Sequence, residues 1–267
     1  MPERLSIADI GKKLAKAGRL EMRPLCVYGA DIAPCESVAA AKVNRCLSEA
    51  ILEMAVKKDM PPIYLGENML EGVCPGGQSW LGFIPFHPHL KDFISIGSPE
   101  FRGGLAEYYK ANPEVAEKSM EAVGKLAPLG KYTVISGCDH LPFGDPGVKA
   151  IICFGNAEQI RNLCGLIHFR STRPFSSTVV PWGPACATMI AYPAGIAEKA
   201  PDGAAFVGPT DPTGNAWFPE SHLVIGLPIK VSRQMCEDLE DSFIEKKPSL
   251  AYPKRRVNPT GSATKTE

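Results

Sequence analysis

The stretch VKAIICFGNAEQIRNLCGLIHF, residues 148–169, decides the predicted fold. Its first part, 148–154, is almost entirely apolar and rich in β-branched side chains, which is typical of a buried strand. Asn156 then offers an N-cap, and the apolar residues Ile160 and Leu163 share one face of the helix that it begins. A buried strand that runs directly into an amphipathic helix indicates an α/β protein.

The same order of strand and helix occurs in the first half of the chain. Apolar segments predict strands at 23–30 and 62–66, and an alanine-rich segment between them predicts a helix at 37–57. Further elements follow from the same patterns: helices at 6–18, 113–126 and 232–243, and strands at 204–208 and 223–229.

Because each half has a strand, a helix and a second strand, an internal duplication is suggested. We predict an α/β fold of two similar strand–helix–strand lobes around mixed sheets. The predicted boundaries are an N-terminal helix at 1–20, a first lobe at 21–130, a second lobe at 131–245 and a flexible tail at 246–267.

The composition limits the partners of the protein. Lys plus Arg and Asp plus Glu number 29 each, so no net charge recruits nucleic acid or an anionic membrane. No apolar run approaches the ~20 residues that span a bilayer, and residues 1–20 show a Lys-rich amphipathic pattern instead of a signal peptide. We expect a cytoplasmic protein that binds neither nucleic acid nor membranes, with homo-oligomerisation left open. Its nine cysteines are then expected to be reduced thiols.

Two cysteines stand at corners where a strand gives way to a helix. Cys74 begins Cys-Pro-Gly-Gly, a turn before a helix start that would lower a thiol pKa, and Cys186 follows Pro184 in a similar corner. Ligands of open α/β sheets gather beyond the carboxyl ends of the strands, so a duplicated fold would bring both corners to one crevice. We predict both cysteines as metal ligands, or one of them, Cys74 or Cys186, as a nucleophile or acid. The alternative is that both are small core residues.

A third group of donors follows the apolar run that ends at residue 136. Here we predict Cys138 as a metal ligand and His140 as a catalytic base, with His222 as an alternative base. The CxxC and HxxxH spacings of zinc sites are absent. His87 and His89, separated by one proline, would face the same side of an extended segment as metal or haem ligands, or lie in a surface turn.

Tryptophan and amide side chains complete the predicted pocket. Trp80 and Trp182 each adjoin a glycine or proline corner and would form a wall for a planar ligand. Asn156 and Gln159 begin the helix of the second half, where their amides could bind a cofactor or ligand, although both are also ordinary capping residues. Neither GxGxxG nor GxxxxGK[ST] is present, so the usual nucleotide-binding loops have no support.

These motifs, in this order, resemble an uncharacterised protein family. Cys74-Pro-Gly-Gly, the stretch 148–169, ACATMIAYP from residue 185 and HLVIGLPIKVSRQMCEDLE at 222–240 are similar to the ArCR proteins of archaea and anaerobic bacteria, over residues 20–245. The resemblance implies an α/β protein in an anaerobic, cytoplasmic setting, and it brings no established reaction. The segment GPTDPTGNAWFPESH lacks a cysteine that we expect in the family, so a metal site there would use Glu220 or His222 instead.

Three functions are compatible with these residues. The first is a redox or metal-cofactor protein of anaerobic metabolism, in which Cys74, Cys138 and Cys186 hold an iron–sulfur cluster or, with a histidine, haem iron. The second is a metal-free enzyme with a cysteine nucleophile or acid and a histidine base, acting on a small organic substrate. The third is a small-molecule-binding module with structural thiols. We favour the first, with a small-molecule ligand or a redox partner, because thiols stand at several strand ends.

Overall fold

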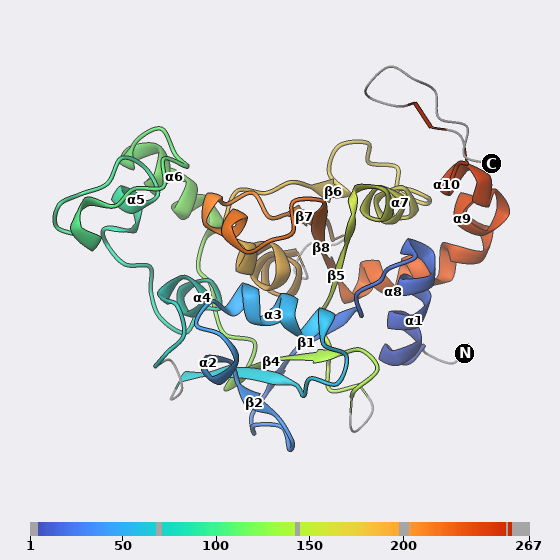
Figure 1. Ribbon diagram of the computed structural model, residues 1–267, viewed down its shortest axis with the longest axis horizontal. Helices are drawn as coiled ribbons and strands as arrows, with labels where there is room; N and C mark the ends of the chain where they lie inside the picture. The colour runs from blue at the N-terminus through green and yellow to red at the C-terminus, as the bar shows by residue number, and fades with distance from the viewer. Residues whose placement is uncertain (1–4, 68–70, 142–144, 198–202, 255, 258–267) are drawn as a thin grey trace.

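The strands of the protein form one mixed sheet (Figure 1). The computed structural model describes residues 5–67, 71–141, 145–197, 203–254 and 256–257. Within them, eight strands pair in the order β2-β3-β4-β1-β5-β8-β7-β6. Their bounds are β1 (Leu25–Ala30), β2 (Val38–Ala39), β3 (Ile63–Gly66), β4 (Tyr132–Gly137), β5 (Ala150–Asn156), β6 (Thr178–Val179), β7 (Ala205–Gly208) and β8 (His222–Pro228). The predicted α/β class is confirmed, and both predicted lobes contribute to this one sheet.

The two halves of the sheet have the same topology. The first half has the order β2-β3-β4-β1, and the second half, counted from its outer edge, has the order β6-β7-β8-β5. The outer pair is parallel in both halves, and the other pairs are antiparallel. β1 and β5 pair antiparallel at the centre and join the halves. This topology is what an internal duplication would produce, whereas a duplication of the sequence itself stays a prediction.

The helices follow the predicted pattern with one clear exception. The α-helices are α1 (Ile7–Gly18), α2 (Ala40–Val43), α3 (Leu47–Val56), α4 (Pro75–Trp80), α5 (Leu90–Phe93), α6 (Pro113–Val123), α7 (Ala157–Ile167), α8 (Ile229–Asp238), α9 (Phe243–Lys246) and α10 (Pro248–Ala251). Short 3-10 helices are η2 (Arg102–Gly104), η5 (Pro212–Ala216) and η6 (Leu239–Asp241), and η3 (Ala187–Ile196) is a π-helix. The predicted continuous helix at 37–57 is divided: Val38–Ala39 form β2, Ala40–Val43 form the short helix α2, and the chain then leaves the helix before α3. Asn44 is extended, and its side chain accepts the N–H of Cys46, so a separate helix begins at Leu47.

Side chains of the central strand β5 alternate between two cores. Ile152 and Phe154 pack in the core that contains α3 and η3, whereas Ile151 and Cys153 pack in the core that contains α1, α7 and α8. β5 is therefore buried on both faces, which explains why residues 150–155 read as a continuous apolar run. The candidate site lies on the α3 and η3 side.

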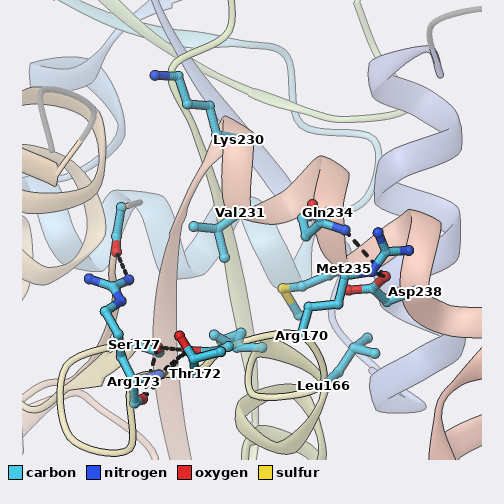
Figure 2. Close-up of a pocket in the computed structure, with 13 residues that line it drawn as sticks. Leu166, Arg170, Thr172, Arg173, Ser177, Lys230, Val231, Gln234, Met235 and Asp238 are labelled. Atoms are coloured by element: carbon cyan, nitrogen blue, oxygen red, sulfur yellow. Dashed lines mark hydrogen bonds and ion pairs between the residues drawn. The ribbon is translucent and has the colours of Figure 1, made fainter. Parts of the chain in front are cut away.

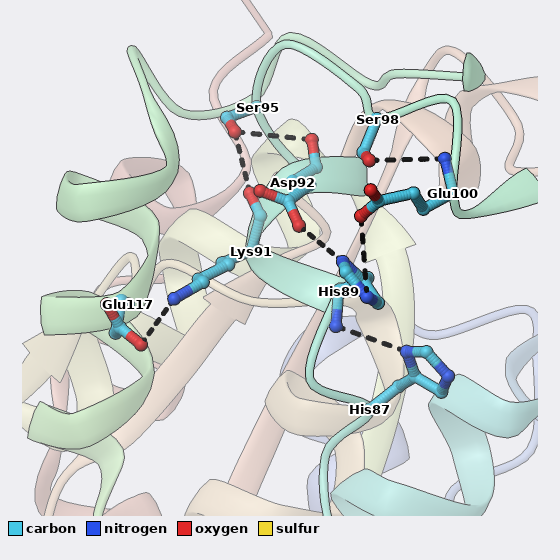
Figure 3. Close-up of polar contacts among 8 residues, drawn as sticks. All are labelled: His87, His89, Lys91, Asp92, Ser95, Ser98, Glu100 and Glu117. Carbon is cyan, nitrogen blue, oxygen red and sulfur yellow. Dashed lines mark hydrogen bonds and ion pairs between the residues drawn. The ribbon is translucent and has the colours of Figure 1, made fainter.

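Residues 82–130, which follow α4 in the chain between β3 and β4, have no counterpart of similar length in the second half, where residues 209–221 join β7 to β8. We call residues 82–130 the long connection. This connection carries α5 and α6, which stand out at one end of the molecule in Figure 1, away from α1 and α8. Polar contacts fasten it internally (Figure 3): Lys91 Nζ lies 2.7 Å from a Glu117 carboxylate oxygen, and the Ser95 hydroxyl donates to the Lys91 carbonyl at 2.6 Å.

The first residues of the segment predicted as a flexible tail make defined contacts. α10 ends at Ala251, whose buried carbonyl accepts from Asn162 at 2.9 Å. The Tyr252 hydroxyl donates to the carbonyl of Ala17, and its ring lies under the Arg19 guanidinium at 3.6 Å. Apolar burial thus extends beyond the predicted boundary at 246, while residues 258–267 of the predicted tail lie outside the described residues.

Candidate functional site

The site pocket is a cavity of about 270 Å³ between α3, α4, η3 and the long connection. Three kinds of side chain stand out in its lining. The thiols are Cys46, Cys74 and Cys186; the carboxyl groups are Glu107 and Asp211; the aromatic rings are Trp80, Phe93, Phe101, Tyr109, Trp182 and Trp217, with His87 beside them. The structure therefore brings together Cys74, Cys186, Trp80 and Trp182 of the predicted set, although their roles stay predictions.

Each thiol of the site pocket stands immediately before a helical segment. Cys46 precedes α3, Cys74 precedes α4 and Cys186 precedes η3. The Cys74 sulfur accepts the Gly77 N–H at 3.3 Å and lies within hydrogen-bonding reach of the Cys46 thiol. The Cys186 sulfur lies 2.7 Å from the Ser48 hydroxyl of α3, so two segments 138 residues apart meet at this point.

Contrary to the prediction from the sequence, Cys74 and Cys186 do not occupy equivalent positions in the two halves of the sheet. Cys186 precedes the helical segment between β6 and β7, and Cys46 precedes the helix between β2 and β3, so these two cysteines are equivalent. Cys74 follows β3, and its counterpart after β7 is Asp211. We also predicted that both corners lie at one edge of the sheet, beyond the carboxyl ends of the strands. This is wrong, because β3 and β7 are separated by five antiparallel pairings and run in opposite directions. The corners meet because α3 and η3 cover the same face of the sheet.

The Cys74 thiol is the most acidic of the three. The hydrogen bond from Cys46 is the largest cause that lowers the pKa of Cys74, to about 6, and the N–H groups of Leu47 and Gly77 act in the same direction against burial. The pKa of Cys46 is raised, first because its proton is held by the Cys74 sulfur and then because of burial. Burial also raises the pKa of Cys186, which is 4% exposed. Near neutral pH, Cys74 is therefore the thiolate and its two neighbours are thiols.

The carboxyl groups face each other across a threonine. The Thr213 hydroxyl donates to Asp211 at 2.9 Å, and it also forms a hydrogen bond with Glu107. Burial, followed by the nearby Asp211, raises the pKa of Glu107 to about 7. Burial raises the pKa of Asp211 as well. The pocket thus holds a group that can take up or release a proton near neutral pH, which is the requirement for acid–base catalysis.

Aromatic rings form the walls of the site pocket. The rings of Trp80 and Trp182 meet edge to face with centroids 5.8 Å apart. Two cations lie over these rings: Lys110 Nζ is 4.7 Å from the Trp182 ring centre, and the guanidinium of Arg102, which also lines the pocket, is 4.4 Å from that of Phe93. This arrangement suits a small, largely apolar ligand whose reactive end reaches the thiols.

Three predicted residues lie away from the pocket. Cys138 is buried in the opposite core, where it contacts Gly11 of α1, so it cannot share a ligand with Cys74. His140 is exposed after β4, at the end of the sheet opposite the one where β3 leads toward Cys74. His222 begins β8, and its ring nitrogen lies 2.9 Å from the Ser221 hydroxyl. The predicted bases and the predicted third thiol are therefore not part of the site pocket.

The side-chain amides of Asn156 and Gln159 cap the start of α7. The Asn156 side chain accepts the N–H groups of Glu158 and Gln159, and the Gln159 side chain accepts the N–H of Asn156, which is a complete capping box for α7. Gln159 also donates to the Arg19 carbonyl at 2.5 Å. The alternative capping role thus accounts for both amides, and the structure does not bring them to the pocket.

His87 lines the site pocket, whereas His89 does not. The His87 ring stacks on Phe101 with centroids 4.4 Å apart. A His89 ring nitrogen lies 2.9 Å from the Asp92 carboxylate, as Figure 3 shows. Throughout the described ranges, no group of three or more His, Cys, Asp or Glu side chains is arranged to hold a metal ion. The two histidines are explained by these contacts.

A larger pocket of about 390 Å³ lies between α7 and α8 (Figure 2). Arg170 forms an ion pair with Asp238 there, Arg173 donates to the Gly203 carbonyl at 2.8 Å, and Lys230 lies at its margin. It contains neither a thiol nor any residue of the predicted site. The site pocket remains the better candidate because it combines a thiolate, a titratable carboxyl group and aromatic walls.

Glu107 and Cys46 line the site pocket, and the sequence predicted neither of them as a site residue. A sequence signal existed for the neighbouring corner: PGGQSW follows Cys74, and PTGNAW follows Asp211. Aligning these hexapeptides pairs Cys74 with Asp211 and leaves Cys46 as the counterpart of Cys186. No comparable signal marks Glu107, because it lies in the connection that the second half lacks.

An α/β protein with a mixed sheet and a thiol-lined aromatic pocket is the class that the fold and the site define. A family model described as uncharacterised ArCR matches residues 13–238, and the chain belongs to this family, as its motifs led us to expect. No curated protein and no solved structure matches the chain. Across the part of the chain that the structure describes, no helix is long and apolar enough to cross a membrane. The anaerobic setting, the cytoplasmic location and homo-oligomerisation stay predictions.

Proposed function

We propose that the protein is a cysteine-dependent enzyme, in which the Cys74 thiolate attacks an electrophilic small organic substrate held between the aromatic walls. The observation that carries this proposal is the position of Cys74, whose sulfur lines the pocket and accepts hydrogen bonds from Gly77 and Cys46. A thiolate is the nucleophilic form of cysteine, and donors that stabilise it make it available near neutral pH. Glu107 is the group that would exchange the proton of the reaction.

The proposal is tested by the rate at which each thiol of the intact protein reacts with iodoacetamide, followed by mass spectrometry between pH 5 and 9. At pH 5.5 a thiol of pKa about 6 is about a quarter ionised, against roughly 0.1% for an ordinary thiol. After allowance for the lower nucleophilicity of an acidic thiolate, Cys74 should react roughly tenfold faster than the exposed Cys35. A Cys74 rate that follows the Cys35 rate at every pH would sink the proposal.

The walls are tested separately. Trp182→Ala should open the pocket and weaken protection of Cys74 by a neutral aromatic amide such as benzamide, added at millimolar concentration during alkylation. Phe175→Ala is the matched control, because Phe175 is an exposed aromatic residue outside the pocket. Loss of protection in the control, or equal protection in both variants, would contradict a ligand site between these walls.

Metal binding through thiols is the second candidate, and it keeps the redox function that the sequence first suggested. The convergence of Cys46, Cys74 and Cys186 on one pocket favours it, since thiolates hold iron–sulfur clusters and also serve as haem ligands. These sulfurs would have to rearrange, because they are not arranged as a ligand group. Protein produced and purified without oxygen should then contain iron in stoichiometric amount and lose it in Cys186→Ala. Iron-free protein with a reactive Cys74 would favour the metal-free enzyme.

A further inference from the structure

Cys46 and Cys74 are held side by side by the main chain. The Cys74 N–H donates to the carbonyl of Arg45, the residue before Cys46, at 2.8 Å. The Cys46 N–H is held in turn by the Asn44 side chain at 2.9 Å. The hydrogen bond between Cys74 and Arg45 joins the two segments directly beside the cysteines, and the Cys46 thiol lies within hydrogen-bonding reach of the Cys74 sulfur. Both residues are half-buried free thiols that line the site pocket.

The two thiols differ in a way that gives each a separate role. Cys74 accepts the Gly77 N–H and the Cys46 proton, which makes it the attacking sulfur. Cys46 keeps its proton as long as the Cys74 thiolate accepts it. Once Cys74 is consumed in a bond to substrate, this largest cause of the raised pKa of Cys46 disappears, and Cys46 can react next.

We propose that Cys46 and Cys74 are a redox dithiol that reduces a small, uncharged organic disulfide bound in the site pocket. This inference rests on the proposed function, because it needs Cys74 as the thiolate nucleophile. A second thiol beside the nucleophile has no part in a simple alkyl or acyl transfer, whereas reduction of a disulfide needs two. The aromatic walls of the pocket favour an apolar, uncharged substrate.

The reaction balances with the groups in the pocket. The Cys74 thiolate attacks one sulfur of the substrate disulfide, which forms a mixed disulfide on Cys74 and releases the first thiolate. Cys46 gives its proton to that thiolate and attacks the Cys74 sulfur, which forms the Cys46–Cys74 disulfide and releases the second thiolate. Two electrons pass from the two protein sulfurs to the substrate. A low-molecular-weight dithiol, such as dithiothreitol in an assay, returns the protein to its reduced state.

The test uses the reduced full-length protein with 4,4′-dithiodipyridine, an aromatic, uncharged disulfide whose released thiopyridone absorbs light. The wild-type protein should release two thiopyridones at the pocket and form a Cys46–Cys74 cross-link, identified by peptide mass spectrometry. Cys46→Ser should release one and keep the adduct on Cys74. Cys74→Ser should release no thiopyridone at the rapid rate that the pocket thiols show in the wild-type protein. Cys35→Ser is the matched control, and it should behave as the wild-type protein in the pocket.

The outcomes separate this inference from the proposed function. A wild-type protein that reacts rapidly at Cys74 but keeps the adduct, as Cys46→Ser does, overturns the dithiol and leaves the thiolate enzyme in place. An adduct that forms first on Cys46 overturns the assigned roles. If Cys74 reacts no faster than Cys35, both proposals fail. If Cys74→Ser prevents folding, Cys74→Ala with an unchanged far-UV spectrum replaces it in the same assay.

Discussion

Arg23 fixes the end of α3 that lies away from the thiols. The residue is 5% exposed, and its guanidinium donates to the carbonyls of Met54, Lys58 and Met60 at 2.9, 2.6 and 2.8 Å, with an Asp139 carboxylate oxygen at 3.7 Å. Arg23→Met keeps the apolar stem but leaves these carbonyls without a donor, so we expect the free energy of unfolding to fall by about 2–4 kcal/mol in a urea titration. Arg161→Met, at an exposed ion pair, should change it by less than about 0.5 kcal/mol. Similar losses in both variants would contradict this role.

Glu107 should make stability depend on pH. Its pKa is raised to about 7 in the folded protein, from 4.5, so its stabilising effect is complete below pH 4.5 and is lost as the pH rises through 7. Glu107→Gln mimics the protonated form, and its stability relative to the wild-type protein should rise by about 1–2 kcal/mol between pH 5 and pH 8, after allowance for screening of a half-buried group. Urea titrations at both pH values measure this difference. Glu114→Gln, at an exposed surface pair, should show no such trend.

At the scale of elements, η3 packs directly against β8 at Gly226, which has no side chain to keep them apart. A Cβ added at Gly226 would lie 2.2 Å from the Thr188 carbonyl oxygen and 2.9 Å from Pro193 Cγ. Because a backbone atom cannot turn aside, Gly226→Ala should destabilise the protein by at least about 1–3 kcal/mol and displace η3, which carries Cys186. Gly195→Ala, where no atom lies within 4 Å, should be neutral or slightly stabilising. Thermal unfolding compares them, and an unaffected Gly226→Ala variant would show that η3 is loosely seated.

The sequence predicted the elements better than their meeting points. Strand β5 and helix α7 were predicted closely because burial on two faces and a capping box leave strong local patterns. Cys74 and Cys186 were predicted at corners, which are local features. Their contact with Cys46 and Glu107 was not, because it depends on how α3, η3 and the long connection pack, and no periodicity along the chain records that packing.

At the scale of the whole molecule, the predicted lobes share one sheet and its hydrophobic cores. β1 and β5 pair at the centre of the sheet, and α1, from the start of the chain, packs with α7 and α8 of the second half. The site pocket likewise takes Cys74 from one half and Cys186 from the other. Elements that share both a sheet and a core lose each other's support when either half opens.

We therefore expect a single cooperative transition in urea. Tryptophan fluorescence, which reports the pocket through Trp80, Trp182 and Trp217, should coincide with far-UV circular dichroism, which reports the whole sheet. Arg23→Met, a change in the first half, should move both curves to lower urea by the same amount. A fragment of residues 145–257 should be unfolded, because β5 would have an unpaired edge and α7 and α8 would lack α1. Two separated transitions, or a folded fragment, would show that the lobes are independent domains and that the pocket lies at an interface able to open.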